Sequence, residues 1–263
     1  MKRRFFTQCT FLFFLIAVFI FPSVCNAAHP LITDDTGTQG KGNYQIEINA
    51  EFGYDKATED DVTVKETGTE MAGVLSYGIR DSVDVVLGVP YQWNNAWEDG
   101  DMTSDENGIS DMSLELKWRF FETKGSSLAV KPGMTLPTGD DEKGLGAGRS
   151  AYGICFMITK QAGPLVIHFN IGYSRNDNLA DERKDIWHTN LASEVQAHDK
   201  LKLVANIGIE KNPDKTSHVD PAFVLGGFVY SITDAFDIDF GLKAGLNKPE
   251  SDYSILAGTA YRF

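Results

Sequence analysis

Hydrophobic and polar residues alternate strictly along residues 43–54. Every second residue from Tyr44 to Tyr54 is apolar, and those between are polar, acidic or glycine. Because the side chains of a strand point alternately to opposite faces, this segment has one apolar and one polar face. The same period of two recurs so often along the chain that lipid is a more economical partner for the apolar faces than a protein core. The pattern predicts strands of a membrane barrel.

The alternation continues to the last residue and predicts about twelve strands of ~10 residues, the length with which a tilted strand crosses a bilayer. The expected strands are residues 43–54, 66–77, 83–93, 112–120, 128–136, 152–158, 165–173, 187–196, 201–210, 221–230, 236–243 and 253–263. The segment 221–230 is apolar on both faces and fits the pattern least clearly. The predicted fold class is all-β: a closed antiparallel transmembrane β-barrel that follows a cleaved signal peptide.

Short and long connections alternate between these strands. Short turns near residues 80, 123, 163, 199 and 234 are expected on the periplasmic side, with the longer loops facing outward. An even number of strands leaves both termini of the chain on the short-turn side. Aromatic residues near strand ends fit the two interfacial girdles of a membrane barrel.

The first 28 residues have the pattern of a signal peptide. Lys2, Arg3 and Arg4 give a positive start, residues 11–21 are an unbroken apolar run, and Ala27 and Ala28 are small residues suited to cleavage. The sequence therefore divides into a signal peptide (1–28), a periplasmic lead or partial plug (29–42) and the barrel (43–263).

Removal of the signal peptide leaves one cysteine. Cys9 and Cys25 lie within it, so Cys155 has no intramolecular disulfide partner in the exported chain. We interpret Cys155 as a small residue of the barrel wall.

Acidic residues outnumber basic ones, 37 to 24, which gives a net charge of −13 and argues against a nucleic-acid partner. Many acids fall in the expected loops: Glu59, Asp60, Asp61, Glu98, Asp99, Asp101, Asp105, Glu106, Asp140, Asp141, Glu142, Asp177, Asp181, Glu182 and Asp185. We interpret them first as solvated loops. The alternative is cation bridging to lipopolysaccharide, for which carboxylates are suitable ligands. No loop has the spacing of an EF-hand.

The polar faces of the strands predict a lumen with charges of both signs, either water-filled or salt-bridged. The pore-lining candidates are Glu47, Glu51, Asp84, Glu115, Lys117, Arg119, Lys131, His168, Asn170, Asn190, Glu194, Lys202, Asp237, Asp239, Lys243 and Arg262.

Two groups in the expected lumen suggest more specific roles. If Phe236 pairs with Phe263, then Asp237 lies opposite Arg262, as a selectivity constriction or as an ion pair that closes the periplasmic mouth. On the strand 221–230, Phe223, Leu225, Gly227 and Val229 share the inward face and suggest an apolar track for a hydrophobic solute. A slip of one residue would turn this set to lipid.

Several turn segments resemble a known family. Residues 29–42 (HPLITDDTGTQGKG), 77–81 (YGIRD), 89–91 (VPY) and 136–140 (LPTGD) are similar to segments of the outer-membrane family named for the MetA-pathway of phenol degradation. The resemblance implies a barrel that takes up small compounds, such as aromatic or other hydrophobic ones, across the outer membrane of a Gram-negative bacterium. The last strand, which ends at Phe263, also resembles the C-terminal strand that the outer-membrane assembly machinery recognises. The expected partners are this machinery, outer-membrane lipid and lipopolysaccharide, and a small-molecule solute.

The rival class is an outer-membrane lipid hydrolase or protease. His168 and His188 are the residues to inspect, but pairing Tyr173 with Trp187 leaves these histidines ~13 Å apart, too far to share a metal. No serine lies two residues from either histidine, so no triad is assembled. We expect no catalytic residue, no metal site and no cofactor. The function predicted is passive or facilitated uptake; the alternative is a structural or surface-interaction barrel without an open pore.

Overall fold

The computed structural model describes residues 29–59 and 61–263, so the predicted signal peptide and residue 60 lie outside it. These residues form thirteen strands and one short 3-10 helix, Asp141–Lys143. The strands are β1 (Tyr44–Glu59), β2 (Val62–Arg80), β3 (Val83–Glu98), β4 (Asp101–Ile109), β5 (Met112–Thr123), β6 (Ser126–Leu136), β7 (Tyr152–Ala162), β8 (Leu165–Arg175), β9 (Asp185–His198), β10 (Leu201–Glu210), β11 (Ala222–Ser231), β12 (Phe236–Gly245) and β13 (Tyr253–Arg262).

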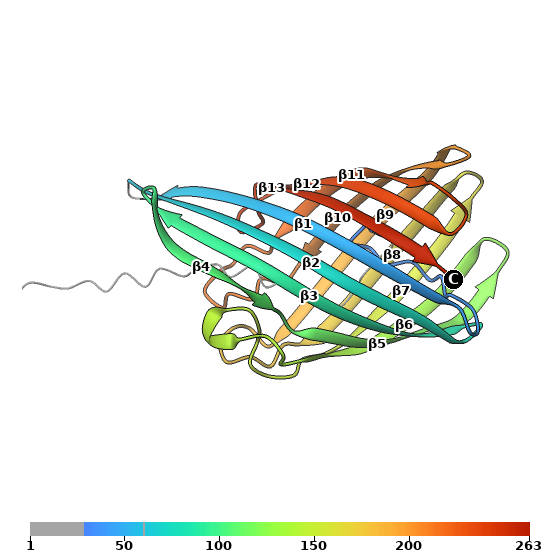
Figure 1. The fold of residues 1–263 in the computed structure, drawn as a ribbon, viewed down its shortest axis with the longest axis horizontal. Coiled ribbons are helices and arrows are strands. Elements are labelled where there is room, and N and C mark those ends of the chain that lie inside the picture. The colour runs from blue at the N-terminus through green and yellow to red at the C-terminus, as the bar shows by residue number, and fades with distance from the viewer. Residues whose placement is uncertain (1–28, 60) are drawn as a thin grey trace, which may run out of the picture.

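Twelve of these strands close into an antiparallel barrel (Figure 1). Each strand from β5 to β13 pairs with its neighbour in sequence, β13 pairs with β1, and β1, β2, β3 and β5 complete the ring. Closure leaves no strand edge inside the ring exposed to lipid. The predicted fold class, an all-β barrel of about twelve strands, is confirmed.

The acidic stretch after Trp93 is a hairpin, whereas a loop was expected. β3 continues to Glu98, and β4 returns beside it after a turn at Asp99 and Gly100, both with positive φ. Asp-Gly is the two-residue turn that a right-twisted hairpin favours, so the turn residues outweigh the polar composition of the strand. β1 and β2 also pair past the end of β13, as far as Glu59 and Val62. The four strands β1–β4 therefore project beyond the barrel (Figure 1).

The short connections lie together at the other end. Residues 81–82, 124–125, 163–164, 199–200 and 232–235 join the strands at the end where the chain terminates (Figure 1). Tyr44 and Phe263 exchange two backbone hydrogen bonds there, of 2.8 and 3.0 Å. We refer to this as the turn end and to the opposite end as the loop end.

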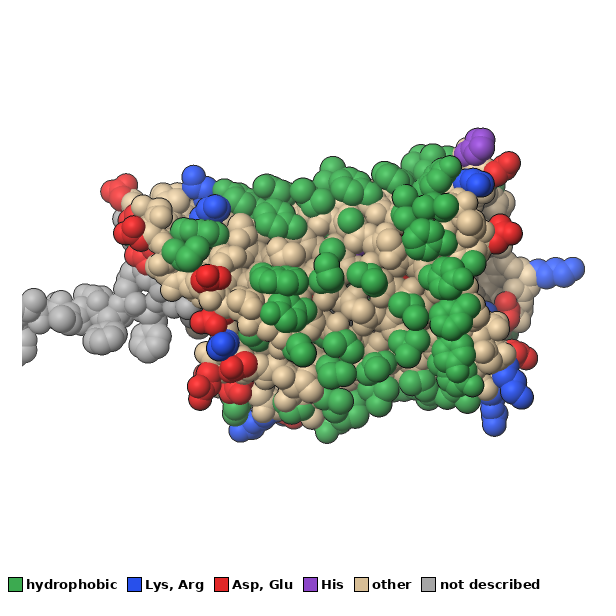
Figure 2. Space-filling view, in the orientation of Figure 1, with side chains coloured by type: hydrophobic (Ala, Val, Ile, Leu, Met, Phe, Trp, Pro, Cys, Tyr) green, Lys and Arg blue, Asp and Glu red, His purple; other side chains and the backbone are tan. Residues whose placement is uncertain are grey.

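The outer surface of the barrel is a band of large apolar side chains between charged ends (Figure 2). Ile48, Trp118 and Leu242 are about half exposed, although each belongs to a well-ordered ladder. Tyr44 stacks on Tyr77 at the turn end, with ring centroids 4.5 Å apart. Such a band is stable only against lipid, so the structure is that of a transmembrane barrel. Within the described part of the chain, no helix has the length and apolar character to cross a membrane.

Candidate solute pathway in the barrel lumen

The segment 29–42 enters the barrel at the turn end and runs along the lumen. Near the mouth, the Lys41 and Gln39 amides donate to the carboxylates of Asp81 and Asp84, at 3.1 and 2.9 Å. At the other end of the segment, His29 Nδ1 lies 2.5 Å from Asp239 Oδ1 on β12. The segment therefore reaches from the turn between β2 and β3 to β12.

Close backbone packing admits the segment at the mouth. The Gly42 amide donates to the Gly78 carbonyl at 2.8 Å, and Gly78 donates to the Asn43 carbonyl at 3.0 Å. A Cβ atom at Gly78 would lie 1.8 Å from the carbonyl oxygen of Gly40. Only glycine leaves room for the segment at this position.

Two asparagine side chains from the wall bind the backbone of the segment. Asn170 Oδ1 accepts from the Asp34 amide at 2.6 Å, and its Nδ2 donates to the Asp34 carbonyl at 2.8 Å. Asn206 Oδ1 accepts from the amides of Ile32 and Thr33, at 2.8 and 3.0 Å. These two side chains thus hold the segment through its backbone amide and carbonyl groups and not through its side chains.

A buried charge cluster fixes the middle of the segment. The Asp34 carboxylate lies 2.8 Å from Lys117 Nζ and 2.9 Å from Lys131 Nζ, and Lys131 also lies 3.1 Å from Glu115. The side chains of Asp34 and Lys131 are 2% and 1% exposed. Buried charges persist only when compensated, and removing one partner of such a pair costs about 3–5 kcal/mol. Asp34 is therefore the main electrostatic anchor of the segment.

Asp237 and Arg262 form the predicted ion pair, but in a different register. Arg262 Nη1 lies 2.7 Å from Asp237 Oδ2, while Phe236 pairs with Tyr261 and not with Phe263. The Arg262 amide donates to the carbonyl of Ala235 at 2.9 Å. Arg262 and Phe263 therefore lie beyond the position paired with Phe236, the first residue of β12. A shift of two residues keeps every side chain on its face, which is why the pair still forms.

Other predicted lumen residues make ion pairs closer to the loop end. Lys243 Nζ lies 2.9 Å from Glu51 and 3.2 Å from Glu250, a loop residue that we did not predict. Glu47 lies nearer the turn end, where Ala260 pairs with both Glu47 and Asp237; it is buried, and Asn49 Nδ2 donates to it at 3.2 Å. The lumen therefore carries charged side chains at more than one level.

The predicted histidines stay apart. Tyr173 pairs with Trp187 as predicted, which sets His168 opposite Ala192 and His188 opposite Gly172. Among the described residues no group of three potential metal-binding side chains comes together.

His168 lies in a polar row that also contacts the segment. Its Nδ1 is 3.0 Å from Thr159 Oγ1, and Thr159 accepts the Thr36 amide at 3.1 Å. Glu194 lies 3.7 Å from His168 Nε2, beyond hydrogen-bond distance, and 3.5 Å from Lys202. The Thr159 hydroxyl of this row is thus bonded to the segment.

The remaining predicted residues take simple positions. Asn190 is buried and pairs with Asn170 across β8 and β9. Arg119 lies 3.3 Å from Glu122 near the turn end. Cys155 is buried beside Ala129 and Met157, on the inner side of the wall.

An apolar cluster interrupts this polar lining. Leu31 of the segment is buried with Ala192, Val204, Phe223, Leu225 and Leu256. Phe223 and Leu225 thus face the lumen, and Val229 packs against the same cluster. The inserted segment covers this apolar part of the wall.

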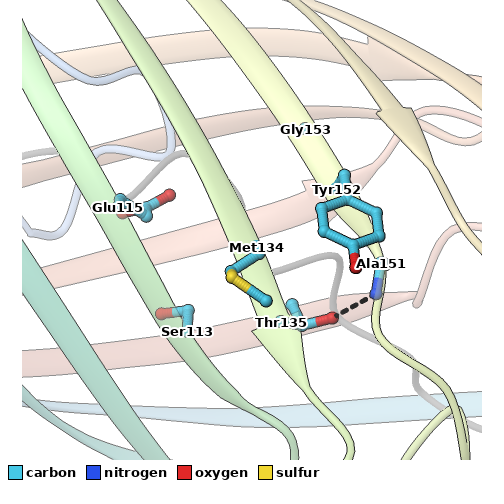
Figure 3. A pocket seen from close by; sticks show the side chains of 7 residues that line it. All are labelled: Ser113, Glu115, Met134, Thr135, Ala151, Tyr152 and Gly153. Atoms are coloured by element: carbon cyan, nitrogen blue, oxygen red, sulfur yellow. Dashed lines mark hydrogen bonds between the residues drawn. The ribbon is translucent and has the colours of Figure 1, made fainter.

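A narrow crevice lies between β5, β6 and β7 (Figure 3). It is lined by Ser113, Glu115, Met134, Thr135, Ala151, Tyr152 and Gly153. The Ala151 amide donates to Thr135 Oγ1 at 3.1 Å beside it. Its walls close on each other, and Glu115 at its side is already paired with Lys131.

Ion pairs organise several of the acidic loops. Lys211 lies 2.9 Å from Asp220, and this hydrogen bond, helped by the Asn212 amide, holds the pKa of Asp220 below its usual value. Lys248 similarly lies 2.7 Å from Asp252 and lowers the pKa of that carboxyl. These carboxylates already have cationic partners within the chain.

Comparison with known proteins agrees with this architecture. The family model described as "Putative MetA-pathway of phenol degradation" matches residues 33–263. The chain belongs to this family. The match begins within the inserted segment and covers the whole barrel of this family member. No curated protein matches the chain.

Solved barrels resemble this family member at low sequence identity. The translocator domain of the autotransporter NalP from Neisseria meningitidis is 11% identical, over 85% of this chain and 89% of that one, with a TM-score of 0.53. The NanC porin is 8% identical over 81% and 98%, with a TM-score of 0.54. The Ralstonia pickettii toluene transporter TbuX is 11% identical over 87% and 91%, with a TM-score of 0.50. They share the fold, a barrel of the outer membrane of Gram-negative bacteria.

The sequence left residues 29–42 between two alternatives, a periplasmic lead and a partial plug, and did not identify their partners in the lumen. Asp34, Thr159 and Asn206 were not candidates, although all three are bonded within the lumen. Asn206 occupies an inward position of the expected strand 201–210, and Thr159 continues the alternation one residue past the expected strand 152–158, which was the available signal. Asp34 lies outside any periodic segment, so alternation could not assign it.

Proposed function

We propose that this protein carries small hydrophobic compounds, aromatic ones among them, across the outer membrane by passive or facilitated diffusion. The observation that carries the proposal is the composition of the lumen, which is filled by a separate segment and not by a continuous core. Polar bonds to asparagine, aspartate and lysine hold that segment. Twelve strands lie between the eight that side chains fill and the sixteen that leave an aqueous channel, so in this proposal removal of the segment opens the passage.

Residues 29–42 are, in this proposal, a plug that follows a cleaved signal peptide of residues 1–28. The predicted lumen residues then have two roles. Asp84, Asn170, Lys117 and Lys131 hold the plug, whereas Glu51 and Lys243 line the part of the pathway above it.

The apolar side chains on β11 favour a hydrophobic solute. Phe223, Leu225 and Val229 face the lumen among charged neighbours, where a pathway for ions would gain nothing from them. The toluene transporter TbuX shares the barrel fold, which fits this solute class. Outer-membrane lipid and lipopolysaccharide contact the apolar band, and the assembly machinery reads the strand that ends at Phe263.

Transport accounts for the lumen better than catalysis does. A lipid hydrolase or protease needs an accessible nucleophile beside its base, and the hydroxyl next to His168 is covered by the plug. A structural barrel without an open pore is the main alternative, and the inserted segment is what would keep it closed.

The proposal is tested by uptake and by conductance. Cells that lack the protein, and cells that carry it or its variant without residues 29–42, are given labelled toluene at low concentration, with a labelled neutral sugar as control. We expect toluene uptake to rise with the protein and sugar uptake to stay constant with the full-length chain. Single-channel recording of the refolded proteins should show larger steps for the deletion variant. Equal toluene uptake with and without the protein, together with silent recordings from both forms, would contradict the proposal.

A further inference from the structure

Two glycines on neighbouring strands are paired at the centre of the apolar cluster. Gly227 of β11 pairs with Gly241 of β12, Val204 of β10 pairs with Gly227, and Leu256 of β13 pairs with Gly241. Across four neighbouring strands the inward positions are thus valine, glycine, glycine and leucine. Without side chains at the two central positions the wall is hollowed to the backbone there. We call this hollow the glycine recess.

The plug fills the glycine recess with two apolar side chains. Pro30 lies over its floor: a Cβ atom built at Gly241 would be 2.9 Å from Pro30 Cβ, and one at Gly227 would be 3.1 Å from Pro30 Cγ. Leu31 packs beside it against the same cluster as Val204, Leu225 and Leu256. Leu31 is 5% exposed, so the recess is full while the plug is in place.

Polar groups hold the plug on either side of these two residues. His29 contacts Asp239 before them, and Ile32 and Thr33 donate to Asn206 after them. No hydrogen bond or ion pair is needed for the seating of Pro30 and Leu31 themselves, because their side chains are wholly apolar. Their place in the recess is therefore open to any apolar group of similar shape.

We propose that the glycine recess is a binding site for a neutral monocyclic aromatic molecule, and that Pro30 and Leu31 occupy it in the plugged state. Solute binding and plug insertion then exclude each other, so the solute itself favours opening. This inference rests on the proposed transport of hydrophobic compounds and assigns a site and a solute class to it.

The shape and charge of the recess select this class of solute. A floor of bare backbone between valine and leucine walls suits a flat ring, and the apolar cluster supplies its driving force. Asp239 lies two residues before Gly241, and Lys243 lies two residues after it. Lys243 is compensated by Glu51 and Glu250, at 2.9 and 3.2 Å, whereas the partner of Asp239, His29, belongs to the plug and leaves with it. The carboxylate of Asp239 then disfavours an aromatic carboxylate, whereas a ring without charge meets no repulsion.

The site is tested by the affinity for fluorobenzene, measured by ¹⁹F NMR on the full mature protein in lipid nanodiscs, with empty nanodiscs subtracted. Leu225→Gln places a polar group in the wall of the recess and should weaken binding at least tenfold. Met157→Gln is the matched control, because Met157 is an equally buried inward residue in a separate apolar cluster. It should leave the affinity unchanged.

Competition by the plug is tested by Leu31→Asn. Loss of the buried leucine shifts the plug toward release, and since apparent affinity scales with the competent fraction, fluorobenzene should bind about tenfold more tightly. A spin label at Thr38→Cys, in a Cys155→Ala background, should become more mobile when fluorobenzene is added to the otherwise wild-type chain.

The outcomes separate this site from transport itself. If the cells take up toluene but Leu225→Gln and Met157→Gln bind fluorobenzene with equal affinity, the proposed site is overturned and the proposed function stands. Weaker binding to Leu31→Asn than to wild type, or a spin label that fluorobenzene does not affect, would overturn the competition. Absence of protein-dependent toluene uptake would reject the proposed function whatever the binding results.

Discussion

The barrel wall and the plug are built on opposite principles. Strands such as β1 are fixed by continuous backbone ladders to two neighbours and by apolar side chains against lipid. The plug, residues 29–42, has no ladder, and it is held by side chains of the wall that reach its backbone and by the charge of Asp34. Backbone pairing makes the wall one cooperative unit, whereas a set of separate polar bonds permits the plug to leave without opening the wall.

The largest effect that would break this comparison is expected from Asp34→Ala. The variant removes the carboxylate that lies between Lys117 and Lys131, and loss of a buried partner costs about 3–5 kcal/mol. The plug should be released while the barrel stays folded. Hydrogen exchange should become fast in residues 29–42 and remain slow in the strands; fast exchange in the strands as well would show that plug and wall are one unit. Asp35→Ala is the control, because Asp35 is one-third exposed and 3.6 Å from Lys117.

A smaller loosening is expected from Asn206→Ala. The amides of Ile32 and Thr33 lose their shared acceptor, and Thr33 Oγ1 loses its 2.8 Å hydrogen bond from Asn206 Nδ2. Groups left buried without these partners cost about 1–3 kcal/mol. Asn190→Ala removes the same side chain from an inward position of the neighbouring strand. Protease cleavage within residues 29–42 should accelerate in the first variant only, and equal rates in both would rule out the role given to Asn206.

Gly78→Ala sharpens the comparison at the mouth. Its methyl group would collide with the Gly40 carbonyl, so the plug must shift at a cost of about 1–3 kcal/mol. Gly73→Ala on the same strand has open space and serves as the control. Single-channel recordings should show more frequent openings for Gly78→Ala than for Gly73→Ala, and indistinguishable records would contradict the proposed contact.

The smallest change in stability is expected in the loops, whose ion pairs involve neither the barrel wall nor the plug. The folded pKa of Asp220 is lowered by Lys211, so this interaction stabilises the loop above the ordinary carboxyl pKa and is lost as the pH falls through the folded value. The Asn212 amide, which donates to Asp220 at 3.1 Å, should exchange faster relative to neighbouring amides at acidic pH. Asp220→Asn should remove that pH dependence, and its persistence would assign it to another group.

The sequence predicted the wall well because alternation is a direct consequence of strand geometry. The lumen-facing set on β11 followed from the alternation of side chains alone. The predicted register at Phe236 was wrong by two residues, which keeps each side chain on its face, so Asp237 and Arg262 still lie within reach of each other. The hairpin at Asp99 and Gly100 was missed since its strand is polar on both faces, and only the turn dipeptide indicated it.

The contacts of the plug could not be predicted in the same way, and the sequence left residues 29–42 between a plug and a periplasmic lead. These residues have no period, and most are placed by contacts with distant strands, as Asp34 is by Lys117 and Asn170. The glycine recess required knowledge of which strands are neighbours, because Gly227 and Gly241 belong to different strands and gain meaning only when paired. Such information resides in tertiary pairing and not in local pattern.

The seam between β1 and β13 sets an order of events during assembly. It joins the first strand of the chain to the last, so the ring is complete only when β13 has paired. The partners of the plug lie on β3, β5, β6, β8, β10 and β12, and they surround one space only in the finished ring. Residues 29–42 precede every strand in the chain, yet we expect them to reach their places last.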